Sequence, residues 1–215
     1  YLNHHHNISV SKQKTHMATM QNLSSVIQDK HFIVIDDFLT PSYHKHILIN
    51  ATAEGSQWHY HSNITYHPSV EFSHSDPGDY GFGSMLTSNG IDWKDEFYLP
   101  FCYQIQDLLP PTTIGRVRFD MTCYNPDNRV HQAHIDTNTP HYASIYYVND
   151  SDGETIIYNQ EFDGDFEAPS DLTIMTKVEP KANRLLIFDG KYFHTGSSPS
   201  KHKNRIIINS NFYID

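Results

Sequence analysis

Two histidines and one aspartate form the pattern in this sequence that is best suited to metal chemistry. His134 and Asp136 are separated by one residue, and His194 follows 60 residues after His134. In an extended strand, residues two apart point to the same face, so His134 and Asp136 can approach one metal ion together. Two imidazoles and one carboxylate on one face leave coordination positions open for a co-substrate and dioxygen, as non-haem Fe(II) requires. We therefore expect these three residues to be the metal ligands and the catalytic centre.

The His-x-Asp spacing is weak evidence by itself, because histidine and aspartate are both frequent in this chain. The alternative interpretation, without a metal, is a surface strand that carries two polar residues. The context of His194 favours the metal site, since it follows an apolar strand at 185–188 and a turn at 189–190. A closed four-ligand zinc site would need further Cys or His residues at short spacing, which the sequence lacks.

Arg205 is the third element of the predicted site, eleven residues beyond His194 at the start of an apolar run. An arginine at such a position usually packs the aliphatic part of its side chain against the protein and leaves its guanidinium group in water. A planar guanidinium can, however, bind a carboxylate through two parallel hydrogen bonds. Tyr124, ten residues before His134, could supply a hydroxyl to the same carboxylate. Arg205 and Tyr124 are thus the predicted cofactor-binding residues. Three other arginines rank lower because they precede the metal motif: Arg116, Arg118 and Arg129.

Strands must position these residues, and the second half of the chain is rich in strand and turn signals. The strands are expected at 117–124, 142–148, 154–158, 172–178, 184–188 and 205–213. Helices are expected at 41–53 and 100–109, and a short strand at 31–35. Residues 56–89 are interpreted as loops and short strands, whose aromatic residues from Trp58 to Tyr80 either line a substrate mouth or cover one end of a sheet. Residues 1–20 are interpreted as a tail and residues 21–215 as one domain. The fold class is mainly β with flanking α, a β-sandwich or jelly roll.

Composition excludes several partners. The net charge of -10 argues against nucleic acid and against an anionic membrane surface. No apolar run reaches the ~20 residues of a membrane span. Two cysteines cannot build a disulfide framework, which favours a cytoplasmic location. Strand–helix–strand alternation is missing, so a doubly wound nucleotide-binding fold is not expected. The sequence predicts no oligomeric state.

The His134-x-Asp136 pair, His194 and Arg205 together resemble the 2-oxoglutarate and Fe(II)-dependent oxygenase superfamily. The prolyl 4-hydroxylase branch is the most similar one, and the resemblance covers roughly residues 30–215. Further similar segments are Gly153–Thr155, Pro180–Asp189, His194–Gly196 and the stretch from Phe32 to Leu39 followed by a helix.

The resemblance implies a double-stranded β-helix with N-terminal helices packed on one sheet. It implies Fe(II) as the metal and 2-oxoglutarate as the co-substrate, with Arg205 holding the far carboxylate of 2-oxoglutarate. The implied reaction consumes dioxygen, releases succinate and CO2, and hydroxylates a C–H bond of the substrate. A peptidyl proline is the first candidate for that substrate, and a free amino acid or other small molecule is the second. His131 is interpreted as a residue that faces the substrate or supports the ligands.

Two other function classes stay open at this point. A cupin-like metalloenzyme that does not use 2-oxoglutarate would not need the carboxylate-binding Arg205. A non-catalytic jelly-roll binding module would tolerate the loss of Asp136 and bind no metal. Halide incorporation is disfavoured because Asp136 occupies the position that a halide would need.

Overall fold

The computed structural model describes residues 31–64, 79–87 and 98–215. Within these residues the chain forms two antiparallel sheets and two helices, so the predicted mainly β jelly roll with N-terminal helices on one sheet is confirmed. The large sheet contains, in spatial order, β1 (Phe32–Ile35), β8 (Arg184–Asp189), β5 (His141–Tyr147), β10 (Asn204–Ile214), β4 (Thr112–Cys123), β3 (Gly81–Thr87) and β2 (His59–His61). The small sheet contains β7 (Ile174–Val178), β6 (Thr155–Glu161) and β9 (Tyr192–Gly196).

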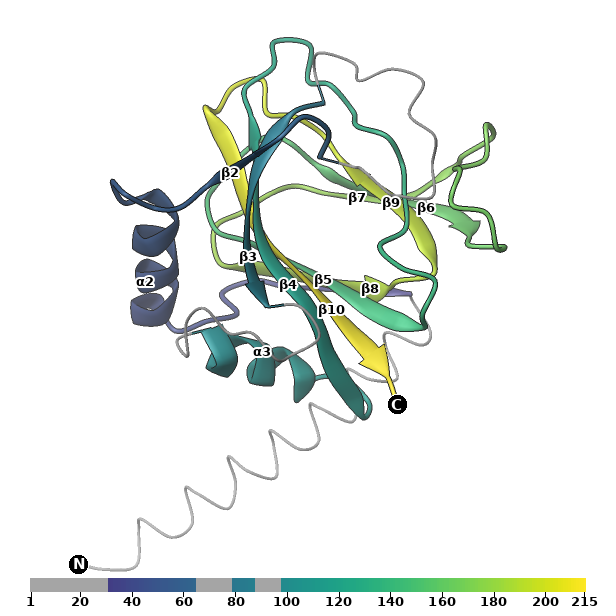
Figure 1. The fold of residues 1–215 in the computed structure, drawn as a ribbon, viewed down its shortest axis with the longest axis horizontal. Helices are drawn as coiled ribbons and strands as arrows, with labels where there is room; N and C mark the ends of the chain where they lie inside the picture. The colour runs from purple at the N-terminus through teal and green to yellow at the C-terminus, as the bar shows by residue number, and fades with distance from the viewer. Residues whose placement is uncertain (1–30, 65–78, 88–97) are drawn as a thin grey trace, which may run out of the picture.

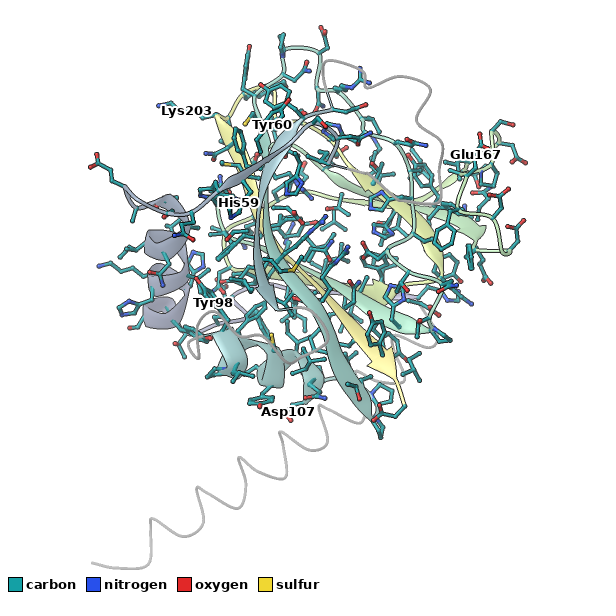
Figure 2. All side chains as sticks on the ribbon, in the orientation of Figure 1. His59, Tyr60, Tyr98, Asp107, Glu167 and Lys203 are labelled. Atoms are coloured by element: carbon teal, nitrogen blue, oxygen red, sulfur yellow. The ribbon has the colours of Figure 1, made fainter. Side chains whose placement is uncertain are left out.

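The two helices, α2 (Pro41–Thr52) and α3 (Leu99–Gln106), lie on one side of the large sheet, and the small sheet lies on the other side (Figure 1). Pro41 opens α2 at a position where a missing N–H costs nothing. In Figure 2, Tyr98 lies at the start of α3, whereas Glu167 lies on the loop between β6 and β7, far from the helices. None of the described helices is long and apolar enough to cross a membrane.

The two faces of the large sheet have different roles, and strand alternation explains the difference. On β4, Val117 and Phe119 point to the helices, where they join an apolar cluster with residues of α2 and α3. Arg118 and Asp120 alternate with them and line a cavity on the opposite face. The residues of strands β5, β8 and β10 alternate between the two faces of the sheet in the same way. Their inward apolar residues pack against the small sheet: Ala143, Ile145, Tyr147, Leu186, Phe188 and Ile207.

Tyr146 and Asn183 join the helical layer to the large sheet. The buried Asn183 side chain accepts a hydrogen bond from Leu39 N–H at 2.9 Å and donates one to Leu39 O at 2.8 Å. Tyr146 donates its hydroxyl hydrogen to the same amide oxygen at 3.0 Å and packs edge-on against Phe101 of α3. The positive φ of 65° at Asn183 is a conformation that asparagine tolerates better than most residues.

Some boundaries differ from those expected. Helix α3 ends at Gln106 rather than near 109, because Leu108 and Leu109 form tight turn bonds to Ile105 and Gln106 before Pro110. Strand β4 begins at Thr112, five residues before the predicted start, and strand β9 contains His194, which was expected to follow a turn. The predicted tail at 1–20 lies outside the described residues.

The described aromatic residues of the segment that follows α2 do not line the cavity. Trp58 packs against Phe119, with ring centroids 5.9 Å apart, and so covers the helix side of the sheet. His59 and Tyr60 are exposed on the edge strand β2 (Figure 2). Ile64 is the only residue between 56 and 64 that lines the cavity.

Candidate metal and co-substrate site

The structure brings His134, Asp136 and His194 together, although they come from two separate segments. One potential ligand atom of each residue lies within 4.8 Å of the others. His134 and His194 form an isolated antiparallel bridge, in which each backbone N–H donates to the other residue's carbonyl, at 3.0 and 2.9 Å. The segment around His134 is extended but belongs to no regular strand, which corrects the expected strand. Its alternation is nevertheless present, because Ile135 points away into a separate apolar cluster with Phe193.

Both imidazoles are oriented by a hydrogen bond to the backbone two residues earlier. His134 Nδ1 lies 3.2 Å from Gln132 O, and His194 Nδ1 lies 3.1 Å from Tyr192 O. A carbonyl oxygen can only accept, so each Nδ1 carries the hydrogen and each Nε2 presents its lone pair. An imidazole fixed in this way by its second nitrogen is the usual form of a metal ligand. The donor set therefore fits a divalent metal ion such as Fe(II).

The carboxylate of Asp136 is held at both oxygens. Arg116 Nη2 donates to Oδ1 at 2.5 Å, and Asn211 Nδ2 donates to Oδ2 at 2.8 Å. Oδ2 also faces His194, with 3.8 Å to Nε2. The Asp136 side chain is only 3% exposed. Neither Arg116 nor Asn211 was predicted as part of the metal centre, since only the cross-strand register places them beside Asp136.

The charge state of the three residues suits metal binding. Burial, together with the neighbouring His194, lowers the pKa of His134 to about 3. Burial also lowers the pKa of His194. For Asp136, burial by itself would raise the pKa, but Arg116 and the two histidines hold the pKa well below its ordinary value. At neutral pH the site therefore offers two neutral imidazoles and one carboxylate.

Arg205 lines the same cavity as His134 and His194. This cavity has about 550 Å³ of empty space, including its open mouth. Arg205 is 4% exposed, and its Nη2 donates to Thr155 Oγ1 at 2.7 Å. The Tyr147 hydroxyl donates to the same Thr155 oxygen at 2.7 Å, and the guanidinium lies 5.6 Å from the centre of the Tyr147 ring. Burial lowers the pKa of Arg205. Among the described residues, Arg205 has no ion-pair partner, and its buried Nε has no hydrogen-bond acceptor.

Tyr124 is not brought into the cavity. It follows the end of β4, its side chain is 53% exposed, and it does not line the cavity. Tyr147 is the tyrosine beside Arg205 instead, and sequence reasoning missed it. The available signal was alternation, because Tyr147 shares the inward face of its strand with Ala143 and Ile145.

The remaining candidates have partners of their own. His131 lines the cavity and is buried, as expected for a supporting residue. Its Nδ1 lies 2.9 Å from Asp79 Oδ1 and its Nε2 lies 3.0 Å from Ser198 Oγ. Arg129 also pairs with Asp79, at 2.8 Å. Arg118 pairs with Asp120, at 2.9 Å, inside the cavity.

Comparison with known proteins finds one family match and several solved structures with a similar fold. Residues 119–213 match the 2OG-Fe(II) oxygenase superfamily. No curated protein matches the chain significantly. The fold is similar to that of a Trichoplax adhaerens prolyl hydroxylase, solved in complex with a hypoxia inducible factor peptide fragment. That match has a TM-score of 0.62 and 15% identity, and it covers 94% of this chain and 92% of the other.

Two further solved structures share the fold. A Pseudomonas putida prolyl-4-hydroxylase matches with a TM-score of 0.59 and 10% identity, over 91% of this chain and 99% of that one. The α-ketoglutarate-dependent epimerase SnoN from nogalamycin biosynthesis matches with a TM-score of 0.63 and 9% identity, over 91% of this chain and 83% of that one. Residues 119–213 thus carry the pattern of the 2OG-Fe(II) oxygenase superfamily, and the chain has a prolyl hydroxylase-like fold. Its cofactors are accordingly Fe(II) and 2-oxoglutarate, and its partners include dioxygen and a substrate.

Proposed function

We propose that this protein is a dioxygenase that hydroxylates a C–H bond of its substrate. In the balanced reaction, 2-oxoglutarate, dioxygen and R–H give succinate, CO2 and R–OH, with one oxygen atom going to succinate and one to the product. The observation that carries this proposal is the buried Arg205 guanidinium in the cavity that the two histidines line. A buried cation without an ion-pair partner among the described residues is costly unless an anionic ligand compensates its charge.

In this proposal His134, Asp136 and His194 hold the iron through their Nε2 atoms and Oδ2. Arg116 and Asn211 each donate to one oxygen of Asp136, and Oδ2, the oxygen that faces His194, would be the metal ligand. Bound Fe(II) and 2-oxoglutarate supply the oxidising chemistry. Arg205, oriented by Thr155 and Tyr147, would hold the far carboxylate of 2-oxoglutarate. Tyr124, exposed outside the cavity, has no support for a role in that contact.

The substrate is not fixed by the fold. The similar structures include prolyl hydroxylases and an epimerase, and one scaffold hosts several chemistries. A peptidyl proline and a small molecule are therefore both retained as proposed substrate classes.

The test is an anaerobic titration of the metal-free protein with Fe(II) and 2-oxoglutarate, followed by visible absorption. We expect a weak metal-to-ligand charge-transfer band in the wild-type protein and in Arg184→Ala, a matched control whose arginine pairs with Asp36 outside the cavity. His134→Ala should lose the band, and Arg205→Ala should require at least about tenfold more 2-oxoglutarate, because charge-assisted bonds are lost. Iron binding without a band would favour a metalloenzyme that does not use 2-oxoglutarate. Absence of metal binding would favour a binding module.

A further inference from the structure

The row of inward residues on β4 contains a second cation in the cavity besides Arg205. Register pairs Thr122 with Arg205, Asp120 with Ile207, and Arg118 with Asn209, and all six residues line the cavity. Arg118 is therefore four residues along the strand from the position opposite Arg205. At about 3.3 Å per residue this is about 13 Å of strand, although Arg118 leans toward Asp120 and shortens the gap between the guanidinium groups.

The polar atoms around Arg118 are only partly used. Its Nε donates to Asp120 Oδ2 at 2.9 Å, and within the described part of the chain neither terminal nitrogen has a hydrogen-bond acceptor. Its side chain is 24% exposed and that of Asp120 is 21% exposed. Asn209 is 7% exposed, and its buried Oδ1 has no described donor. Buried polar groups are normally satisfied, so the unpaired Asn209 Oδ1 on the cavity wall points to a ligand, and the open donors of Arg118 lie on the paired strand beside it.

Arg116, by contrast, is already committed to the Asp136 carboxylate. The pair with Asp120 uses only the Nε donor of Arg118, so the terminal nitrogens remain available as donors. The cavity wall therefore presents a guanidinium edge, a carboxylate and an amide side by side. This set is complementary to a zwitterion, since the guanidinium fits a carboxylate and the carboxylate of Asp120 fits an ammonium group. A proline inside a peptide chain has neither charge.

We propose that Arg118, with Asp120 and Asn209, binds the carboxylate and ammonium groups of a free amino acid, which is the substrate class of this enzyme. This inference rests on the proposed function, because it assumes that Arg205 and the metal take the two ends of 2-oxoglutarate. The same guanidinium chemistry would also suit the 1-carboxylate of 2-oxoglutarate, so the experiment must separate these two carboxylates.

The experiment uses the full chain loaded anaerobically with Fe(II) and saturating 2-oxoglutarate. Each standard amino acid is added separately, and the charge-transfer band is followed, because a substrate that binds beside the metal shifts it. For any amino acid that shifts the band, the concentration needed for the shift is compared with the concentration needed of its amide and of a blocked proline peptide. We expect at least one free amino acid to shift the band, and its amide to need at least about tenfold higher concentration, since a charge-assisted contact is lost.

Arg118→Gln should require at least about tenfold more of that amino acid, while its half-saturating 2-oxoglutarate concentration stays within about threefold of wild type. A normal charge-transfer band would itself show that this variant is folded. Arg118→Lys keeps the charge but loses the two parallel donors of the guanidinium, so its loss of amino acid affinity should be intermediate. The matched control is Arg184→Gln.

Three results would overturn the inference. No free amino acid shifts the band, only the blocked peptide shifts it, or Arg118→Gln weakens the binding of 2-oxoglutarate as strongly as Arg205→Ala does. Absence of the band in the wild-type protein would instead reject the proposed function.

Discussion

The surroundings of Asp136 show how single residues prepare a metal site before the metal arrives. A carboxylate that is 3% exposed would be unstable without compensation, and Arg116 and Asn211 provide it through one hydrogen bond to each oxygen. A bound cation would contribute the same compensation. Arg116 therefore serves two purposes in our interpretation: it compensates the charge of Asp136 when no metal is bound, and it fixes which oxygen faces the histidines.

Arg116→Gln tests the first purpose. We expect the metal-free variant to lose about 1–3 kcal/mol of unfolding free energy, a value discounted from that of a fully buried pair because Arg116 is a quarter exposed. Mn(II), a redox-stable substitute for Fe(II), should recover much of this loss and stabilise the variant more than it stabilises wild type. Urea denaturation with chelator and with Mn(II) measures both quantities. An equal loss in both conditions would mean that the arginine contributes only packing.

Residue-scale prediction from the sequence reached the ligands but not their supports. His134, Asp136 and His194 could be selected because alternation and the preceding apolar strand are local signals. Arg116 and Asn211 could not be selected, because their proximity to Asp136 depends on which strands pair and in which register. Alternation indicates the inward face for Tyr147, but its contact with Arg205 depends on the same pairing. Tyr124 was predicted from its spacing to His134, but β4 ends one residue before it, so its side chain leaves the inward face.

At the scale of elements, two turns are joined at the edge of the site. Asp152, between β5 and β6, accepts hydrogen bonds from the backbone N–H groups of Ser200, Lys201 and His202, between β9 and β10. The Ser200 hydroxyl and the His202 ring bond to the same carboxylate. Next to it, a side chain on Gly153 would collide with the Ser197 carbonyl and approach Arg205. The Asp152 carboxylate thus holds together the turns that precede β6 and β10, the strands of Thr155 and Arg205.

Asp152→Asn should destabilise the protein by about 1–3 kcal/mol at neutral pH, since several bonds to a charged acceptor are weakened. Burial by itself would raise the pKa of Asp152, but the bonds from His202, Ser200 and Lys201 hold the pKa below its ordinary value of 3.8. The carboxylate therefore stabilises the fold above pH 3.8 and loses this contribution as the pH falls below it.

The difference in unfolding free energy between wild type and Asp152→Asn should consequently shrink between pH 5 and the acid limit of folding. Urea denaturation across this range measures it, with Asp165→Asn on the exposed β6–β7 loop as control. A difference that does not change with pH would show that the charge of Asp152 is not the stabilising feature.

The sequence predicted most elements within a few residues, because apolar runs and turn residues mark them locally. The ends were less accurate. The strand expected at 117–124 gains five residues at its start through pairing with the last strand, a contact between distant segments. The extended segment around His134 is ordered by two isolated bridges, Val130 to Ser197 and His134 to His194, rather than by a ladder, and no local pattern encodes such bridges.

At the scale of the whole molecule, one sheet is shared by two cores. The helices pack on its outer face and the small sheet on its inner face. The general class could be predicted from many short strands and few helices. The strand order could not, since β1 pairs with β8 and β4 with β10, and such pairings join segments that are far apart in the sequence.

Asn183→Ala tests whether the helical layer and the sheet unfold together. The substitution removes three hydrogen bonds, leaves the backbone groups of the buried Leu39 unsatisfied and places alanine at a positive φ. We expect a loss of about 2–4 kcal/mol of unfolding free energy in a single urea transition, followed by both circular dichroism and tryptophan fluorescence. Asn183→Gly, which accepts the positive φ, should lose less.

The control for this experiment is Asn159→Ala, whose asparagine is exposed on β6. Its stability should stay close to that of wild type. Separate transitions for the helical signal and the tryptophan signal in Asn183→Ala would contradict a single cooperative unit.

The alternation along β4 has an evolutionary consequence. Between positions 117 and 120, Val117 and Phe119 face the helical core, whereas Arg118 and Asp120 face the cavity. Mutations at neighbouring positions therefore fall under different selection, one for persistence of the fold and the other for the choice of substrate. A lineage could replace Arg118 and Asp120 and acquire a new specificity, while Val117 and Phe119 preserve the fold.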